Sequence, residues 1–316
     1  MNQAKVLLNN GVRMPVIGLG TYRLYNQHRI SEVLAWAVND FGYRMVDTAK
    51  YYDNEHEIGN FLKSCPVPRQ LFLVSKLWPA DHGHQRTMAA FQKTLESLDV
   101  DYLDLYMVHW PGVEEVAKDP KDREEARAIR ASTWQAITTI TTITTITTIT
   151  TITTIIIVNS NNSMTIATIR KGKGDRGQQL HHSTPQRVVQ LCPRTALVNP
   201  AVNQVEFHPY LYQRELLQYC TENNIQMEAY SSFGKGELLK ERRIIDVAKK
   251  CERTPAQVLL RWAMQHNVIV IPKASVREKL EENSKVFDFE IAAEDMMLIN
   301  ALDKGWRCTW DPTHVI

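Results

Sequence analysis

The sequence predicts a parallel α/β barrel, and the first half of the chain indicates this most clearly. Short apolar stretches alternate there with segments of helical periodicity, as expected for repeated strand–helix units. Three of the apolar stretches end in a charged or titratable residue, namely Asp47, Lys76 and His109. In a (β/α)8 barrel the carboxyl ends of the strands meet at one rim, and active sites lie at that rim. We therefore expect one barrel with its catalytic groups at the strand ends.

The expected elements follow the chain in order. Asn10 and Gly11, between short apolar stretches, predict a β-hairpin before the barrel. The spacing of Gly18 and Gly20 does not fit a dinucleotide-binding glycine motif and instead indicates close backbone approach. We expect strands at residues 16–22, 43–49, 71–77, 104–110, 201–207, 226–232 and 268–272. We expect helices at residues 30–41, 54–63, 87–98, 124–136, 215–223 and 254–266.

Composition narrows the class of protein. A formal net charge of +2 and the lack of a basic stripe argue against a nucleic-acid partner. The five cysteines have no paired spacing, which is typical of free thiols in a reducing compartment. The N-terminus lacks the apolar core of a signal peptide, and the isoleucine-rich stretch after residue 136 is too polar for a membrane span. A soluble cytoplasmic protein without a membrane partner is expected.

Five groups of residues carry a resemblance to a known family. They are Asp47-Thr48-Ala49-Lys50-Tyr51-Tyr52-Asp53-Asn54-Glu55, Val74-Ser75-Lys76-Leu77-Trp78, Asp104-Leu105-Tyr106-Met107-Val108-His109-Trp110-Pro111, Asn203-Gln204-Val205-Glu206-Phe207-His208-Pro209-Tyr210 and Ile271-Pro272-Lys273-Ala274-Ser275. With them the chain resembles the aldo-keto reductase family over residues 4–136 and 184–312. The resemblance implies a single (β/α)8 domain over residues 1–316, with a hairpin closing the bottom of the barrel. A monomer is expected.

The resemblance also implies a set of catalytic residues. A carbonyl reductase delivers hydride to carbon and a proton to oxygen, and it needs an acid that works near neutral pH. By resemblance Tyr52 is this acid, and Lys76 lowers its pKa from a usual value of about 10. Asp47 would orient and pair with Lys76, and His109 would orient the substrate carbonyl. The remaining alternative is a set of unrelated charges at a barrel rim.

The cofactor implied by the resemblance is NADPH. Gln204 would bind the carboxamide of the nicotinamide, and Tyr230 would stack on its ring. The end of the cofactor with the 2′-phosphate and adenine would be bound by Lys273, Ser275, Lys279 and Asn283. At residue 279 the family usually has arginine, and lysine keeps the charge but loses the bidentate hydrogen bond. The alternative for this region is a solvated helix face.

The expected substrate is a small aldehyde or ketone, bound by aromatic side chains. These side chains are Tyr22, Trp78, Trp110 and Trp306. Trp78 and Trp110 directly follow strand ends that carry catalytic residues, whereas a tryptophan near the C-terminus often only covers a core. No metal is expected, because His82 and His84 lack further ligands at workable spacing.

One segment departs from the family. Residues 137–154 are six copies of Ile-Thr-Thr, whose period of three fits neither a helix nor a strand. Such a tract is typical of a translated nucleotide microsatellite. When the codons of residues 171–181 are read one base later, they permit Lys-Val-Arg-Ala-Ile-Gly-Val-Ser-Asn-Tyr. That series has the form of the family's fifth strand, with its Ser-Asn pair.

Two classes of function stay open at this point. The first is an NADPH-dependent enzyme that reduces aldehydes and ketones to alcohols. The second is an inactive or mispredicted gene product in which a retained intron and a frameshifted exon, over residues 137–183, disrupt the fifth strand. A genuine low-complexity insertion is the alternative interpretation of those residues.

Overall fold

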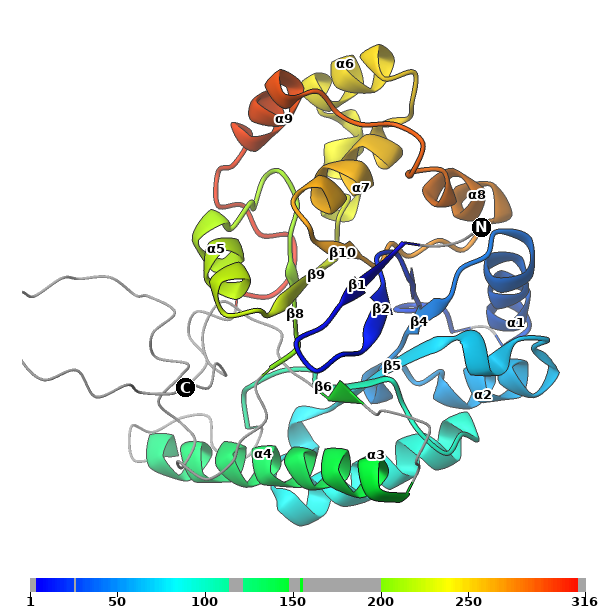
Figure 1. The fold of residues 1–316 in the computed structure, drawn as a ribbon, viewed down its shortest axis with the longest axis vertical. Coiled ribbons are helices and arrows are strands. Elements are labelled where there is room, and N and C mark those ends of the chain that lie inside the picture. Colours follow the sequence, from blue (N-terminus) through cyan, green and yellow to red (C-terminus); the bar gives the residue numbers. More distant parts are fainter. Residues whose placement is uncertain (1–3, 26, 114–121, 148–153, 156–199, 312–316) are drawn as a thin grey trace, which may run out of the picture.

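Parallel strands form the centre of the fold, and helices surround them (Figure 1). The computed structural model describes residues 4–25, 27–113, 122–147, 154–155 and 200–311. One sheet pairs, in this order, β3 (Leu19–Gly20), β4 (Met45–Asp47), β5 (Phe72–Leu77), β6 (Leu105–Val108) and β7 (Thr154–Ile155). A second sheet pairs β8 (Val202–Glu206), β9 (Gln226–Tyr230) and β10 (Ile269–Val270).

The two sheets meet where the first strand reaches the last. Ile17, just before β3, forms a parallel bridge with Val270 of β10, and the Gly18 amide donates to the Val270 carbonyl at 2.9 Å. A Cβ atom on Gly20 would lie 2.7 Å from the Ile271 carbonyl oxygen, so the predicted close backbone approach is confirmed. The described residues thus supply the parallel strands of a (β/α)8 barrel, which is the predicted fold class.

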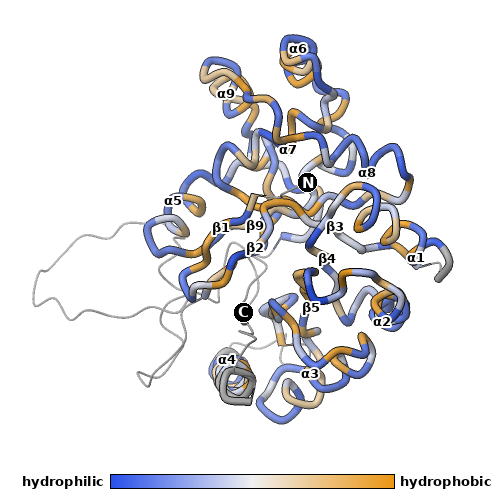
Figure 2. The backbone as a smooth tube through the Cα atoms, turned by 45° about the vertical axis from the view of Figure 1, so that its right-hand side comes forward, coloured by the Kyte–Doolittle hydropathy of each residue, from blue (hydrophilic) through white to orange (hydrophobic). Residues whose placement is uncertain are grey.

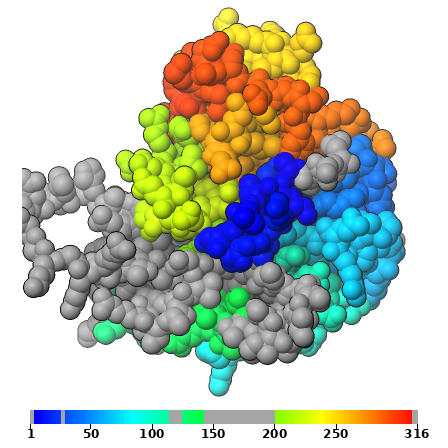
Figure 3. All heavy atoms as spheres, viewed as in Figure 1, coloured from blue at the N-terminus to red at the C-terminus, as the bar shows by residue number. Residues whose placement is uncertain are grey.

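The predicted hairpin precedes the barrel. It consists of β1 (Lys5–Leu7) and β2 (Arg13–Pro15), which pair antiparallel, and Gly11 in the turn has φ +87°. The Asn9 side-chain amide donates to the carbonyl of Pro200, two residues before β8 begins. The hairpin therefore lies across the end of the barrel at which the strands begin (Figures 1 and 3).

Nine helices, counted over the part of the chain that the structure describes, cover the strands. They are α1 (Gln27–Ala35), α2 (Glu55–Ser64), α3 (His84–Leu98), α4 (Asp122–Thr147), α5 (Arg214–Glu222), α6 (Arg242–Lys250), α7 (Pro255–Gln265), α8 (Arg277–Ser284) and α9 (Ala293–Asn300). The predicted start of α7 is confirmed, because Thr254 caps it in a capping box with Gln257. The apolar stretches of the chain gather at the centre, while helix surfaces are hydrophilic (Figure 2). Within the described ranges, no helix is long and apolar enough to cross a membrane.

The structure corrects the interpretation of the first repeat units. We expected a helix to end at residue 136, but α4 continues to Thr147. Ile137 and Ile140 are 1% and 2% exposed, so both face the core. Two residues three positions apart differ by only about 60° around the helix axis, so one such pair can share a buried face. Over a longer series this difference accumulates, and later members turn away from that face. The Thr138 hydroxyl donates to the Trp134 carbonyl four residues earlier, which satisfies that hydroxyl within the helix.

The fifth strand is a two-residue strand formed by the last residue of the repeat, Thr154, and by Ile155 after it. β7 pairs in parallel with β6, with Thr154 opposite Leu105 and Ile155 opposite Tyr106. The codons read as a shifted fifth strand belong to residues 171–181, which lie outside the described residues. The interpretation of those residues as a frameshifted exon stays a prediction.

Candidate active site

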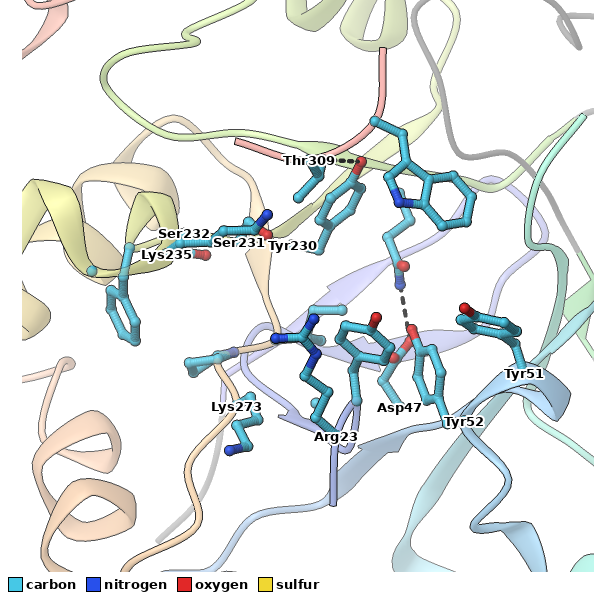
Figure 4. A pocket seen from close by; sticks show the side chains of 18 of the residues that line it. Arg23, Asp47, Tyr51, Tyr52, Tyr230, Ser231, Ser232, Lys235, Lys273 and Thr309 are labelled. Carbon is cyan, nitrogen blue, oxygen red and sulfur yellow. Dashed lines mark hydrogen bonds between the residues drawn. The ribbon is translucent and has the colours of Figure 1, made fainter. Parts of the chain in front are cut away.

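The site is a cavity of about 630 Å³ at the carboxyl ends of the strands. Its lining includes Gly20 of β3, Asp47 of β4 and Tyr230 of β9, each the last residue of its strand, together with His109 just after β6. Figure 4 shows Tyr51 and Tyr52 toward one side of the cavity and the cationic side chains of Lys235 and Lys273 toward the other. A cavity of this size suits an organic cofactor and a small substrate.

A buried ion pair lies at the base of the cavity. Lys76 Nζ donates to Asp47 Oδ1 at 2.6 Å and to the Thr48 carbonyl at 2.8 Å, and both charged side chains are 1–2% exposed. The same ammonium group lies 3.4 Å from the Tyr52 hydroxyl and 4.9 Å from its ring centroid. The three residues come from adjacent parallel strands and the loop after one of them, which is why residues distant in sequence meet here.

Asn54 fixes the loop that carries Tyr52. Its side chain is 1% exposed, donates to the carbonyls of Thr21 and Leu24 at 3.0 and 3.2 Å, and accepts a hydrogen bond from the Thr48 hydroxyl at 2.6 Å. The short 3-10 helix Lys50–Tyr52 is thereby held between the ends of two strands. This arrangement gives Tyr52 a defined position at the cavity wall, where its side chain is 9% exposed.

The direction in which the pKa of Tyr52 is shifted differs from the expectation. We expected Lys76 to lower the pKa of Tyr52, but burial first and the Asp47 charge next raise that pKa well above its ordinary value of 10.0. Lys76 makes its shorter contacts to Asp47 and Thr48, so its charge is largely balanced by Asp47. Tyr52 is therefore a phenol that keeps its proton throughout the neutral range.

His109 is a neutral imidazole in this site. Burial first, and the Lys76 charge next, lower the pKa of His109 well below 6.5. Its ring centroid lies 5.4 Å from that of Tyr52 with the planes 82° apart, and both side chains line the cavity. Two polar side chains from different strands can therefore contact one bound oxygen atom. His109 Nδ1 is buried and makes no hydrogen bond to the described residues.

Gln204 connects the two sheets of the barrel. Its Nε2 donates to Asp47 Oδ2 and to Glu228 Oε2, each at 2.9 Å. Since both amide protons are used in this way, the carbonyl Oε1 of Gln204 is left to accept from a ligand in the cavity. The sequence placed Gln204 in the cofactor site, and the structure brings it to the cavity wall beside Tyr230.

The carboxyl group of Glu228 was missed by the sequence analysis. It lies on β9 with 0% exposure, and burial first and Asp47 next raise its pKa to about 8. The sequence contained a signal, because Glu228 stands between the apolar residues Met227 and Ala229 in the middle of an expected strand. An acid at such a position is rarely buried without a partner.

The aromatic residues expected to bind substrate fall into two groups. Tyr22 lines the cavity, while Trp78 and Trp110 lie behind lining residues. Trp78 stacks on Tyr51 at 4.1 Å, and Trp110 contacts the edge of Trp310 at 4.7 Å between ring centroids. The structure therefore places three of the four expected aromatic residues in or directly behind the cavity wall.

The fourth, Trp306, is not brought to the cavity. Its ring packs at 5.8 Å from both His208 and Tyr210, and its amide donates to the Tyr210 carbonyl. The cavity residue of this segment is instead Trp310, which also lies 6.5 Å from His109 with nearly parallel rings. Spacing alone could not distinguish the two tryptophans, because the segment has no helix or strand that would fix their directions.

The expected phosphate-binding residues are spread over a wider area. Lys273 lines the cavity. Lys279 on α8 pairs with Glu282 at 2.5 Å, and the carbonyl of Ser275 accepts from Arg29. Asn283 is 2% exposed, and its Oδ1 has no hydrogen-bond partner among the described residues. Of these four residues, only Lys273 lies in the cavity wall itself.

The cavity fits a phosphorylated cofactor with a nicotinamide. Three cationic side chains line it: Arg23, Lys235 and Lys273. Ser232 also lines it, and its Oγ is buried without a hydrogen-bond partner in the described chain. A buried unpaired hydroxyl costs about 1–3 kcal/mol, so a ligand that pairs it is favoured. Gly236, with φ +95° and open space beside it, lets the loop after β9 approach such a ligand closely.

One cluster has the composition of a metal site. Ligand atoms of Glu206, His208 and Cys308 lie within 4.8 Å of one another. His208 Nε2 instead donates to Glu206 Oε1 at 2.8 Å, and burial first and Glu206 next raise the pKa of the Cys308 thiol to about 12. His82, from the first pair considered, is held by Thr133 and the Trp110 carbonyl. The expectation that the chain binds no metal stays a prediction.

Known proteins share both the sequence and the fold. The model of the Aldo/keto reductase family matches residues 16–155 and 180–304. Between these ranges it leaves out residues 156–179, a shorter stretch than the segment 137–183 that departs from the family's motifs. Glyoxal reductase of Bacillus subtilis is 37% identical over 98% of this chain and 97% of its own length. Human aldo-keto reductase family 1 member A1 is 35% identical over 96% of this chain and 90% of its own.

Solved structures give the same result. Apo Gox0644 superposes with a TM-score of 0.78 at 32% identity, covering 99% of this chain and 98% of its own. A Gox0644 mutant in complex with NADPH has a TM-score of 0.77 at 31% identity over 99% of this chain and 98% of its own. The chain therefore belongs to the aldo/keto reductase family of NADPH-dependent carbonyl reductases.

Proposed function

We propose that this chain reduces small aldehydes and ketones, with Tyr52 as proton donor and with Asp47, Lys76 and His109 as its catalytic partners. The observation that carries the proposal is the contact of Lys76 Nζ with both Asp47 and Tyr52 at the base of the cavity. A buried ammonium group beside a phenol can stabilise the negative charge that develops on the phenol as it gives up its proton. Unrelated charges at a barrel rim would not need this common contact.

The cofactor would be held along the cavity wall by residues from both sheets. NADPH, when bound, supplies the hydride that is transferred to the carbonyl carbon. The Gln204 carbonyl and the Tyr230 ring would hold the nicotinamide end, in keeping with the free acceptor of Gln204. Lys273 would bind phosphate, with Ser275, Lys279 and Asn283 beyond it. The unpaired Oδ1 of Asn283 supports a ligand contact there.

The proton would come from the Tyr52 hydroxyl. Because the pKa of Tyr52 is raised by burial and by Asp47, the phenol is protonated at neutral pH and is ready to donate. His109, neutral because its pKa is lowered, carries one ring N–H that can donate to the same substrate oxygen. Asp47 holds Lys76 in place and takes no part in the proton transfer.

The substrate would be a small carbonyl compound with an apolar or aromatic substituent. Tyr22 and Trp310 line the cavity, and Trp78 and Trp110 support its wall. Trp306 would act only indirectly, by packing on Tyr210. A relative that is named glyoxal reductase supports a small carbonyl as the starting substrate for assays.

The assembly state and the location are further parts of the proposal. We infer that the enzyme acts as a monomer in the cytoplasm. Cys65, Cys220, Cys251 and Cys308 are free thiols, which fits a reducing compartment. Light scattering after size-exclusion chromatography measures the assembly state, and a dimer in that experiment would contradict this part.

The test of the catalytic assignment is Tyr52→Phe. This change removes only the hydroxyl, so we expect turnover of methylglyoxal with NADPH to fall by roughly 10²-fold or more while NADPH binding survives. The control is Tyr43→Phe, which removes a buried hydroxyl that donates to the Leu280 carbonyl at 3.1 Å, outside the cavity wall. Unchanged turnover in Tyr52→Phe would show that another group donates the proton.

A further inference from the structure

The segment that ends the described chain, residues 306–311, forms part of the cavity wall. Thr309 and Trp310 line the cavity, and Trp310 contacts Trp110 and Trp78. The segment has no regular secondary structure, so hydrogen bonds to the barrel must fix the direction in which Trp310 points.

The hydrogen bonds of the two residues before Trp310, Cys308 and Thr309, converge on one carboxylate, Glu206. It is the last residue of β8, two positions after Gln204, so both side chains lie on the same face of the strand. Glu206 Oε1 accepts from the Cys308 amide at 2.7 Å, and Oε2 accepts from the Thr309 amide at 3.1 Å and from the Thr309 hydroxyl. His208 Nε2 completes the set at 2.8 Å from Oε1.

The chain of contacts reaches the cofactor side of the cavity as well. The Thr309 hydroxyl lies 3.2 Å from the hydroxyl of Tyr230, which ends the neighbouring strand (Figure 4). Thr309 thus joins Glu206 on β8 to Tyr230 on β9. A shift of the segment would therefore move Trp310, while Tyr230 keeps its place as the last residue of β9.

Charge makes this attachment strong. The hydrogen bonds from His208, Cys308 and Thr309 outweigh burial, and they lower the pKa of Glu206 to about 2. Glu206 is therefore ionised throughout the neutral range, and its 1% exposure gives it no access to water as a substitute donor. Hydrogen bonds to a buried charge are stronger than neutral ones, and a buried charge that loses its donors is costly.

We propose that Glu206 is a positioning residue that fixes the segment 306–311, and through Trp310 sets the selectivity of the cavity for carbonyl compounds with a flat, bulky substituent. A carbonyl group held by Tyr52 and His109 has its substituent directed along the aromatic wall. Trp310 is the part of that wall whose direction depends on the hydrogen bonds to Glu206. Small substrates reach Tyr52 without contacting Trp310. The selectivity part rests on the proposed function, whereas the attachment of the segment does not.

The first experiment measures the attachment without catalysis. Glu206→Gln keeps the size of the side chain but replaces one acceptor by an NH2 group that faces donors. By amide hydrogen exchange, we expect the amides of Cys308 and Thr309 to exchange roughly 10-fold faster or more than in the parent chain. Thr309→Val removes one donor and keeps the charge, so a smaller increase is expected. The control is Asp104→Asn, which alters a carboxylate that accepts from the Leu73 amide at the opposite end of the barrel.

The second experiment measures selectivity. In Glu206→Gln we expect kcat/KM for 4-nitrobenzaldehyde to fall roughly 10-fold, mainly through KM, while that for methylglyoxal changes by less than about 3-fold. Trp310→Ala should lower kcat/KM for 4-nitrobenzaldehyde at least as much, and the double variant should be no worse than Trp310→Ala alone, because both changes act on one ring.

The outcomes separate the two proposals. Unchanged exchange at residues 308 and 309 in both Glu206→Gln and Thr309→Val overturns the attachment. If these amides exchange faster but kcat/KM falls equally for the two aldehydes, the role of Glu206 in selectivity is overturned. If the parent chain reduces neither aldehyde, the proposed function fails, while the exchange result still decides the attachment.

Discussion

Gln204 and Asp47, which are 157 positions apart and belong to the two different sheets of the barrel, share a buried hydrogen bond of 2.9 Å. The same amide group also donates to Glu228 Oε2, so one side chain gives a hydrogen bond to each of two buried carboxyl groups. Gln204 thereby couples the buried ion pair of Asp47 and Lys76, on β4 and β5, to β8 and β9 in the second sheet.

The first prediction concerns this coupling. Gln204→Leu leaves Asp47 Oδ2 and Glu228 Oε2 without their donor, and each unsatisfied group costs about 1–3 kcal/mol. We therefore expect the free energy of unfolding in urea to fall by at least about 1 kcal/mol. Gln218→Leu, which removes an exposed contact with Glu222 on α5, is the control and should stay within about 0.5 kcal/mol of the parent. Equal free energies of unfolding for the two variants would mean that the hydrogen bonds of Gln204 to Asp47 and Glu228 do not contribute to stability.

The second prediction concerns pH. Burial first and the Asp47 charge next raise the pKa of Glu228 to about 8 in the folded chain, whereas the unfolded chain loses this proton near the ordinary value of 4.5. The unfolded state then binds fewer protons, and the contribution to stability is present at low pH and lost as pH rises toward 8. Glu228→Gln cannot ionise and should lose less stability than the parent between about pH 5 and about pH 8.

Glu206→Gln provides the contrast for that experiment. The pKa of Glu206 is lowered to about 2, so its contribution to stability is complete above the ordinary value of 4.5 and is lost only in acid. Its substitution should shift stability by a similar amount at both pH values. Urea unfolding of the three proteins measures this. If Glu228→Gln also changed the free energy of unfolding by the same amount at both pH values, Glu228 would be ionised in the folded chain.

The third prediction concerns the choice between NADPH and NADH. Replacing Lys273 and Lys279 with alanine should weaken NADPH binding roughly 10-fold or more and NADH binding much less, because only NADPH has the additional phosphate. Lys273→Ala alone should account for most of the loss, since Lys279 is already paired with Glu282 and is 61% exposed. Fluorescence titration of both cofactors measures the effect.

The control for the cofactor titration is Lys285→Ala. Lys285 pairs with Glu281 at 2.7 Å just after the end of α8, so its loss should affect neither cofactor. If the double variant lost the same affinity for NADPH and for NADH, the additional phosphate of NADPH would bind elsewhere.

Much of the site could be predicted from the sequence, because its residues stand at strand ends within contiguous motifs. Asp47, Lys76 and His109 meet for this reason, and the parallel pairing of β4, β5 and β6 brings them to one rim. The register of a parallel sheet makes the end of each strand a predictable place. The hairpin at Gly11 and the cap at Thr254 were predictable for a similar reason, since each depends on local chemistry.

What the sequence could not predict depends on contacts between distant segments. The raised pKa of Tyr52 follows from burial first and from the Asp47 charge next, and neither can be read from spacing. The choice of Trp310 over Trp306 follows from the attachment of the last segment to Glu206. The burial of Ile137 and Ile140 depends on the surface against which α4 packs, which the period of the repeat does not describe.

The last prediction tests whether the repeat is part of the fold. Ile137→Ala and Ile140→Ala each remove a buried side chain, so each should lower the free energy of unfolding by about 2–5 kcal/mol. Thr139→Ala changes a side chain of the same repeat whose hydroxyl only contacts the Gln135 carbonyl at an exposed site, and about 0.5 kcal/mol or less is expected. If both isoleucine variants were as stable as Thr139→Ala, the repeat would not belong to the core. The interpretation of residues 137–183 as a retained intron and shifted exon would then gain support over their entire length, and sequencing the transcript across them would be the deciding measurement.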